Sequence, residues 1–154
     1  MKKVSLIAIC LLVLSVAPLP ARAQGNAKQG PDVVRDADLE KDSLHNLEVA
    51  RHYFKLKKAY VAALQRCEEI IAGNPVFSKI DEVLYMAGAS SLRLAENKGK
   101  QASKVTSDKL REDARDYLSQ LVNGYPDSSF RKQAEEDLKG LGGPKPKESK
   151  PSTP

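Results

Sequence analysis

The residues that could carry chemistry in this chain are few and scattered. His45, Glu48 and His52 stand at i, i+3 and i+7, so an α-helix would place all three near one face. Imidazole and carboxylate groups are zinc ligands, and such a trio could hold a metal ion weakly. Dedicated helical zinc sites use tighter spacing such as H-E-x-x-H, and a solvated helix face explains these residues equally well. We therefore predict no metal site.

Two pairs of adjacent carboxylates, Glu68-Glu69 and Asp81-Glu82, are the candidates for acid–base chemistry. Neighbouring side chains on a helix diverge by about 100°, so the members of a pair cannot act on one substrate atom. Helix capping and solvation account for both pairs. The sequence has no Gly-rich phosphate loop and no G-x-S-x-G motif. We predict no catalytic residue and no cofactor, and we expect no small-molecule substrate.

Cys67 is the only cysteine outside the N-terminal segment. It falls on the apolar stripe of a predicted helix, which is typical of a small buried hydrophobic residue. A catalytic thiol would need a histidine or another positive group beside it, and Arg66 would point elsewhere on the helix. The five tyrosines are interpreted as packing residues rather than ligand contacts: Tyr53, Tyr60, Tyr85, Tyr117 and Tyr125.

The first 23 residues have the three parts of a secretory signal peptide. A short positive start precedes an uncharged apolar run over residues 4–16, and a small-x-small cleavage site ends at Ala23. The run is about 13 residues long, whereas a membrane-spanning helix needs about 20, which argues against a retained anchor. Cys10 follows Ile9 inside this run, which is a poor context for lipid attachment. We predict cleavage after Ala23 and a periplasmic location. Association of the protein with the outer membrane is compatible with this prediction.

The net charge of the chain is lower once the predicted signal peptide is removed. The full sequence carries 25 basic and 20 acidic residues, a net charge of +5, and cleavage would lower it to +2. Residues 142–154 hold that remaining excess, so residues 24–141 are neutral in sum. No basic stripe with interleaved aromatic residues is present. Nucleic acid is therefore not an expected partner.

The remaining chain predicts an all-α protein. Apolar residues recur at steps of three or four over five segments, and no segment alternates with period two. The first helix is expected to start at a cap provided by Asp42 or Ser43 and to bury Leu44 and Leu56 along with its other apolar residues. The predicted helices cover residues 43–56, 60–71, 79–94, 108–123 and 128–141.

Tails flank these helices on both sides. Residues 24–42 are polar and glycine-containing, and we predict a flexible leader whose end can be helical. Residues 142–154 are rich in proline, lysine and serine and are predicted to be a disordered tail. The folded domain is therefore expected to span residues 43–141.

Two of the predicted helices end alike. Ala63 precedes Pro75 by 12 positions, and Ala114 precedes Pro126 by the same 12. This spacing is typical of the second helix of a tetratricopeptide repeat, where a small residue packs on the partner helix. The two prolines are 51 positions apart rather than about 34, which predicts an insertion at residues 96–107. The residues assigned to repeat packing are Ala50, Tyr53, Ala63, Pro75, Ala87, Gly88, Ala114 and Pro126.

These patterns predict tetratricopeptide-like antiparallel helical hairpins, about two and a half repeats, forming a fragment of a right-handed α-solenoid. A single hairpin cannot bury its apolar face, so neighbouring hairpins must stack. The stack is expected to present a concave surface lined by the first helix of each hairpin. Such surfaces usually hold peptides or proteins.

Two sequence strings give the chain a family resemblance. Residues 78–88 (SKIDEVLYMAG) and residues 121–130 (LVNGYPDSSF) resemble strings of the D subunit of the bacterial β-barrel assembly machinery, the BamD family. The resemblance covers roughly residues 44–141. It implies a tetratricopeptide-like periplasmic protein that helps to assemble or organise the outer membrane. The chain has fewer repeats than members of that family and lacks their lipid-attachment motif.

The function predicted from the sequence is a non-enzymatic periplasmic module for protein–protein interaction. Its expected partners are envelope proteins or peptides, outer-membrane assembly components among them. One alternative is a tetratricopeptide adaptor in cell division or peptidoglycan coordination. The other is a weak metal-dependent enzyme, an alternative that only scattered residues support.

Overall fold

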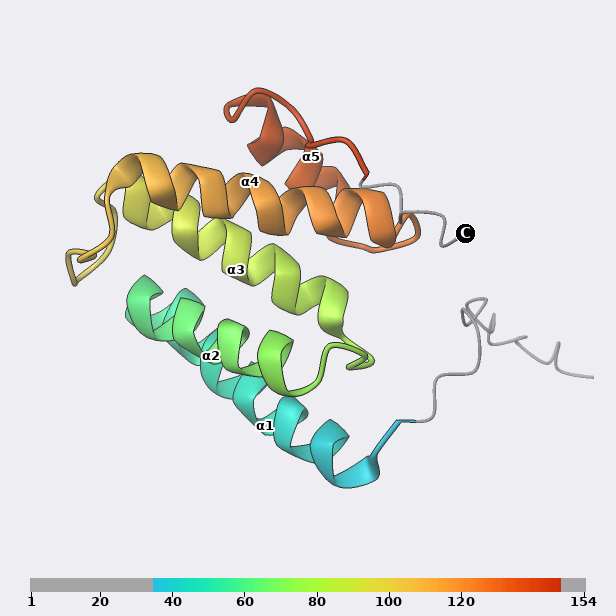
Figure 1. The fold of residues 1–154 in the computed structure, drawn as a ribbon. Helices are drawn as coiled ribbons and strands as arrows, with labels where there is room; N and C mark the ends of the chain where they lie inside the picture. Colours follow the sequence, from blue (N-terminus) through green and yellow to red (C-terminus); the bar gives the residue numbers. More distant parts are fainter. Residues whose placement is uncertain (1–34, 148–154) are drawn as a thin grey trace, which may run out of the picture. The chain divides into compact units, whose positions relative to one another are not determined.

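The computed structural model describes residues 35–147 (Figure 1). Among them are five α-helices and one π-helical turn, and no strand. The fold of this part is therefore all-α, as the sequence predicts. The predicted signal peptide 1–23, most of the leader and residues 148–154 lie outside the described residues.

Helix α1 (Ala37–His52) begins earlier than the sequence predicts. The carboxylate of Asp36 accepts hydrogen bonds from the backbone N–H of Asp38 at 2.9 Å and of Leu39 at 3.1 Å, which caps the helix. The prediction of a cap at Asp42 or Ser43 is wrong. Residues 37–42, which the sequence assigned to the leader, form the first turns of α1. An N-cap can start a helix in a polar segment, so the start of the apolar stripe does not mark the start of the helix.

A π-helical turn, Tyr53–Lys57, continues α1 and ends it. Lys58 then adopts a left-handed conformation (φ 50°), and the N–H of Ala59 donates to the Tyr53 carbonyl at 3.0 Å. The wider π turn rotates Leu56 away from the buried face, so this side chain is 72% exposed. Leu44, also predicted to point inward, is 37% exposed.

Helix α2 (Tyr60–Gly73) buries Ala63, Cys67 and Ile70 and ends at Asn74. The Asn74 side chain is buried, and its Nδ2 donates to the Ser43 hydroxyl of α1 at 3.1 Å. This bond joins the end of α2 to α1 and satisfies two buried polar groups at once.

Helix α3 (Ile80–Ala95) is the most buried element and packs between α2 and α4. Its run of small residues around Gly88 allows α4 (Ser107–Gly124) to approach closely. The loop between them covers residues 96–106, where the sequence predicts an insertion. Thr106 caps α4, and its hydroxyl accepts from the N–H of Lys109 at 3.4 Å.

Helix α5 (Arg131–Lys139) packs on α4 and buries Ala134 and Leu138. The chain then turns back along α4 instead of leaving the domain. Residues 142–147, predicted to belong to a disordered tail, make specific bonds to α4 that are described below. That prediction is wrong for this part of the tail.

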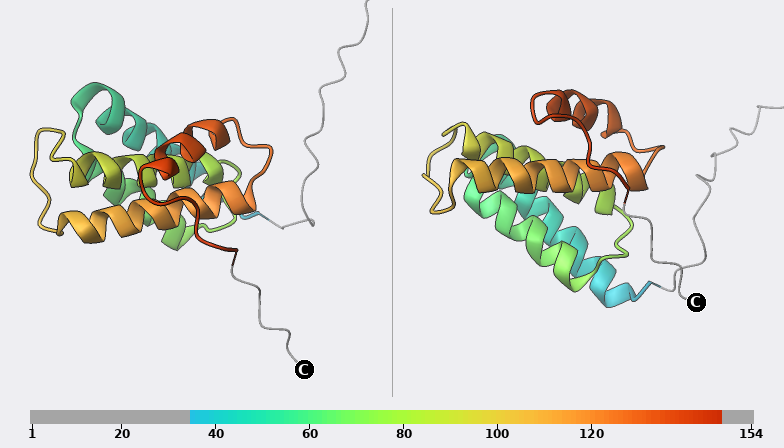
Figure 2. Two further views of the ribbon diagram at one scale, coloured as in Figure 1. Left: turned by 90° about the horizontal axis from the view of Figure 1, so that it is seen from above. Right: turned by 45° about the horizontal axis from the view of Figure 1, so that its top comes forward.

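The main core lies between these helices and consists mostly of alanine and leucine. Each helix packs against the one before it in the chain, and α1 also touches α3. Figure 2 shows the helices in two further views, with α3 between its neighbours. Within residues 35–147, no helix has the length and apolar character needed to cross a bilayer.

The junctions after α2 and after α4 have the same backbone geometry 51 residues apart. Asn74 N–H donates to Ile70 O at 2.8 Å, and Tyr125 N–H donates to Leu121 O at 2.8 Å. The next bonds also correspond, with Phe77 N to Asn74 O and Ser128 N to Tyr125 O both at 3.1 Å. Two segments that share a Gly-x-Pro pattern, Gly73–Pro75 and Gly124–Pro126, therefore turn the chain in the same way.

Candidate binding groove

The histidine-containing face of α1 is exposed. His45, Glu48 and His52 all lie at the surface of the helix. Among residues 35–147, no group of three or more His, Cys, Asp or Glu side chains is placed to hold a metal ion. The structure does not bring this trio together into a site.

The adjacent carboxylates bond to different partners. Glu82 accepts two bonds from the Arg51 guanidinium, at 2.6 Å and 2.5 Å, which ties α3 to α1. Asp81 accepts a bond of 2.7 Å from the hydroxyl of Ser128, in the turn before α5. The hydrogen bond that Arg51 donates to Glu82 is the main reason that the pKa of Arg51 is raised. Both carboxylates therefore connect α3 to other parts of the chain, and they point apart as the helical spacing predicts.

The second carboxylate pair behaves similarly. The Tyr117 hydroxyl donates to Glu68 at 3.2 Å, while Glu69 pairs with Arg66 at 2.6 Å on the exposed side of α2. Burial raises the pKa of Glu68, and the bond from Tyr117 opposes that rise. Burial also raises the pKa of Tyr117. The result is a contact between α2 and α4 rather than an acid–base dyad.

Cys67 is fully buried in the core between the helices. Burial raises the pKa of its thiol to about 12, and the carboxylates of Glu68 and Glu82 add to the rise. A thiol with so high a pKa is protonated at neutral pH and is a poor nucleophile. Its position agrees with the interpretation as a small hydrophobic residue.

The residues assigned to repeat packing differ in their burial. The alanines Ala50, Ala63, Ala87 and Ala114 are all 0% exposed. Gly88 is buried against α4, and Tyr53 is half-buried. Pro75 and Pro126 are exposed in the two junctions, and Pro75 lines the groove described next.

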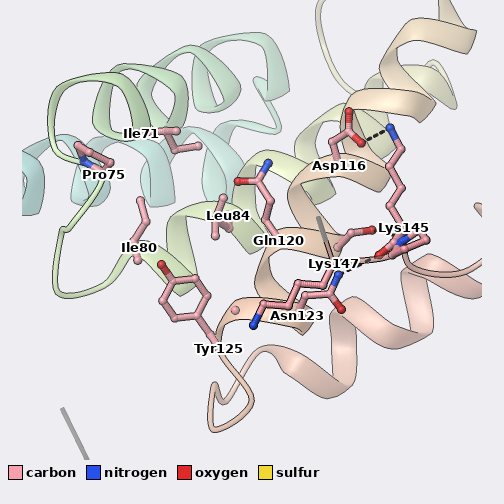
Figure 3. A pocket seen from close by; sticks show the side chains of 13 residues that line it. Ile71, Pro75, Ile80, Leu84, Asp116, Gln120, Asn123, Tyr125, Lys145 and Lys147 are labelled. Atoms are coloured by element: carbon pink, nitrogen blue, oxygen red, sulfur yellow. Dashed lines mark hydrogen bonds and ion pairs between the residues drawn. The ribbon is translucent and has the colours of Figure 1, made fainter. Parts of the chain in front are cut away.

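An open pocket of about 620 Å³ lies where the end of α2, the start of α3 and the second half of α4 meet (Figure 3). We call it the groove. It draws residues from first and second helices alike, whereas the sequence predicted a surface lined by first helices. Its lining consists of Ile71, Pro75, Ile80, Leu84, Asp116, Ser119, Gln120, Asn123, Gly124, Tyr125, Lys145, Pro146 and Lys147.

One side of the groove is apolar and the other is polar. Ile80 and Leu84 of α3 are buried at its base, and Ile71 stands beside them. Tyr125 is 37% exposed on the same side. Figure 3 shows Gln120 and Asn123 of α4 across from these apolar groups. Such a mixture can bury an apolar side chain and hydrogen-bond a backbone at the same time.

The segment Gly142–Lys147, which we call the strap, closes one side of the groove. The N–H of Lys145 donates to the Ser119 hydroxyl at 2.8 Å, and its carbonyl accepts from Asn123 Nδ2 at 2.9 Å. Arg115 Nε donates to the Gly143 carbonyl at 2.7 Å. The amine of Lys145 also pairs with Asp116, as Figure 3 shows. Three α4 side chains thus fix the strap backbone.

The strap decides which polar groups face the groove. Asp116 is neutralised by Lys145, and the amide of Asn123 is already bonded. Gln120 and Lys147 have no hydrogen bond or ion pair to another residue of the described chain and line the groove. They offer an amide and an ammonium group to a ligand.

Sequence reasoning did not find these residues. Gln120, Asn123 and Lys147 are ordinary surface types, and no spacing connects α4 to a segment that composition predicts to be disordered. The one available signal was the pair Gly142-Gly143, which follows the end of α5 and permits the positive φ values of 84° and 80° that turn the strap back.

Comparisons with protein families, with curated proteins and with solved structures found no match to the chain.

Proposed function

We propose that the protein is a non-enzymatic periplasmic interaction module that holds an extended segment of an envelope protein in the groove. Assembly or organisation of the outer membrane is the process that it would assist. The single observation that carries the proposal is the groove itself, with its apolar base and its polar wall.

The repeated junctions support a tetratricopeptide-like interpretation of the helices. Asn74 and Tyr125 end α2 and α4 with similar backbone angles, φ −143° and −129° with ψ 73° and 70°. A fully buried alanine, Ala63 or Ala114, lies on each of these helices. Proteins built from such hairpins use their grooves for peptides and proteins, and α5 would then begin the third unit.

The groove chemistry favours an extended peptide over a small metabolite. A backbone laid along α4 could exchange hydrogen bonds with the Gln120 amide, while an apolar side chain would enter between Ile71 and Leu84. The ammonium group of Lys147 suits a carboxylate of the same segment. The favoured ligand is therefore a short stretch with one or two apolar residues and an acidic residue.

The cellular location rests on the sequence. The charged start, apolar run and small-x-small site of residues 1–23 support export. The two strings at residues 78–88 and 121–130 support a role related to that of the BamD family. Envelope proteins, outer-membrane assembly components above all, are the partners that these features favour.

Site-specific photo-crosslinking in living cells tests the proposal. A photoreactive residue at Gln120, inside the groove, should capture a defined envelope protein. The same residue at Gln133, on the exposed side of α5, is the matched control and should capture much less. Equal capture at both positions would remove the groove from consideration. Turnover of a substrate that requires a divalent metal would contradict the non-enzymatic assignment.

A further inference from the structure

Six exposed lysines gather at the end of the helical domain opposite the groove. Two segments that are far apart in the sequence provide them. The N–H of Lys100 donates to the carbonyl of Lys58 at 3.3 Å, which joins the segments. Figures 1 and 2 show the turn after α1 and the α3–α4 loop at the same end. The lysines are Lys55, Lys57, Lys58, Lys98, Lys100 and Lys104.

The close contact of the two segments fixes this arrangement. Gly99 lies so near Tyr60 that a β-carbon at that position would come within 2.8 Å of the ring. The glycine also has φ 113°, a conformation that other residues rarely adopt. The loop is therefore held against the start of α2. We call residues 53–58 together with residues 96–105 the basic end.

Charge is strongly separated along the domain. Glu96 is the one acidic residue of the basic end, and it pairs with Lys98 at 2.9 Å. The basic end thus has a net charge of +5, while residues 35–147 carry 20 basic and 18 acidic residues in total, a net of +2. The rest of the described chain therefore has a net charge of −3. The small net charge of residues 35–147 therefore conceals a concentration of positive charge at the basic end.

Apolar side chains protrude among these lysines. Leu56 is 72% exposed and stands between Lys55 and Lys57. Val105 is 47% exposed and follows Lys104. Exposed aliphatic residues flanked by lysines are typical of surfaces that enter the headgroup region of a bilayer, because lysine stems lie along the apolar boundary while their amines reach phosphate.

We propose that the basic end binds the surface of an anionic lipid bilayer. The lysines contact lipid phosphates, and Leu56 enters the interface between headgroups and acyl chains. An acidic polypeptide would be attracted by the same lysines but would leave the exposure of Leu56 unexplained. Binding here does not depend on the proposed function of the groove, because the two surfaces share no residue.

The orientation that follows has a consequence for the groove. Helix α4 begins at the basic end, and Gln120 lies 13 residues after Ser107. At 1.5 Å per residue this places the groove about 20 Å from the membrane surface. With α4 standing upright on the membrane, the groove of the bound protein would thus lie clear of the lipid and stay open to a partner.

Vesicle sedimentation tests the attraction. The full chain, purified from expressing cells, should sediment with phosphatidylcholine vesicles only when these contain phosphatidylglycerol. Added salt should weaken the association. Each lysine near such a surface is worth about a fivefold change in affinity, so a triple variant of Lys55→Gln, Lys57→Gln and Lys100→Gln should bind about 100-fold more weakly.

A second triple variant provides the matched control. Lys41→Gln, Lys79→Gln and Lys132→Gln remove the same charge from exposed positions outside the basic end. This variant should retain affinity within about threefold of the unmodified protein. Equal losses in both triple variants would overturn the proposal, since the attraction would then depend on net charge alone. Absence of vesicle binding together with retention on polyglutamate would also overturn it and point to an acidic polypeptide.

Fluorescence tests the insertion of Leu56. The chain contains no tryptophan, so a Leu56→Trp substitution introduces a single reporter. Its emission should shift to shorter wavelength when phosphatidylglycerol vesicles are added. Leu39→Trp, at a position that is 46% exposed on the first turn of α1, should show no shift. An unchanged emission from Leu56→Trp in protein that has bound to vesicles would contradict insertion.

Discussion

Gly88 of α3 lies so close to Leu118 of α4 that a β-carbon at position 88 would come within 2.6 Å of the leucine side chain. The carbonyl of Ala114, also on α4, would stand at 3.3 Å from the same β-carbon. Leu118 is fully buried and has little room to move. This contact sets the separation of the two helices that form the base and the wall of the groove.

Replacing Gly88 with alanine should therefore destabilise the domain. Overpacking typically costs about 1–3 kcal/mol, and the higher helix propensity of alanine offsets up to about 1 kcal/mol of this. We expect a net loss of about 1–2 kcal/mol in the free energy of unfolding, measured by urea denaturation.

Gly73→Ala is the matched control for this change. Gly73 is the last residue of α2, and a β-carbon there would meet nothing within 4 Å. Its stability should stay the same or rise slightly. If both variants have the stability of the parent, α3 and α4 can separate without penalty and the tight contact is not limiting.

The buried alanines show what the sequence can predict and why. Ala50, Ala63 and Ala114 were assigned inward positions from helical spacing, and all three are fully buried. Period 3.6 determines a face as long as the helix stays regular. Leu56 departs from this rule because it lies within the π-helical turn, where the period is no longer 3.6.

The groove could not be predicted from the sequence for a different reason. Its polar wall depends on bonds between Asn123 and the backbone of Lys145, and backbone partners leave no side-chain signature. Composition correctly marks Pro144 and Pro146 as unable to continue a helix. It does not distinguish a segment that leaves the domain from one that packs along it.

Because the pKa of the Cys67 thiol is raised, we expect the protein to lose stability in alkaline solution. Its thiol has a pKa of about 12 in the folded protein against 9.0 for a free thiol, so the folded state holds its proton more tightly. The protonated thiol makes its full contribution to the free energy of unfolding below about pH 9. This contribution falls as the pH rises toward 12, and about 2 kcal/mol of it is lost at about pH 10.5. Unfolding by urea at several pH values measures this loss.

A Cys67→Ala variant isolates the thiol from the tyrosines, whose raised pKa values act in the same direction. The variant should be less stable at neutral pH, because it leaves a small cavity, and should lose less stability between pH 8 and about pH 10.5. The same pH dependence in both proteins would show that Cys67 is not the responsible group.

The sequence predicts both export and the N-terminus of the mature protein. Cleavage after Ala23 should give a chain that begins at Gln24 and carries no lipid. Intact-mass spectrometry of protein from the periplasmic fraction checks this. A chain that begins at a lipid-modified Cys10 would contradict the cleavage site and would anchor the protein to a membrane by its N-terminus.

The strap should be protected from hydrogen exchange although composition suggests disorder. The Lys145 N–H donates to the buried hydroxyl of Ser119, and Asn123 holds the carbonyl of the same residue. A hydrogen bond contributes about 1 kcal/mol net, so Asn123→Ala should increase exchange at the Lys145 amide by about fivefold to tenfold. Gln133→Ala, on the exposed side of α5, should leave that exchange rate unchanged.

Rapid exchange of Lys145 in the unmodified protein would mean that the strap does not stay on α4 in solution. The groove would then lose the wall that presents Lys147, and with it the preference for an acidic segment.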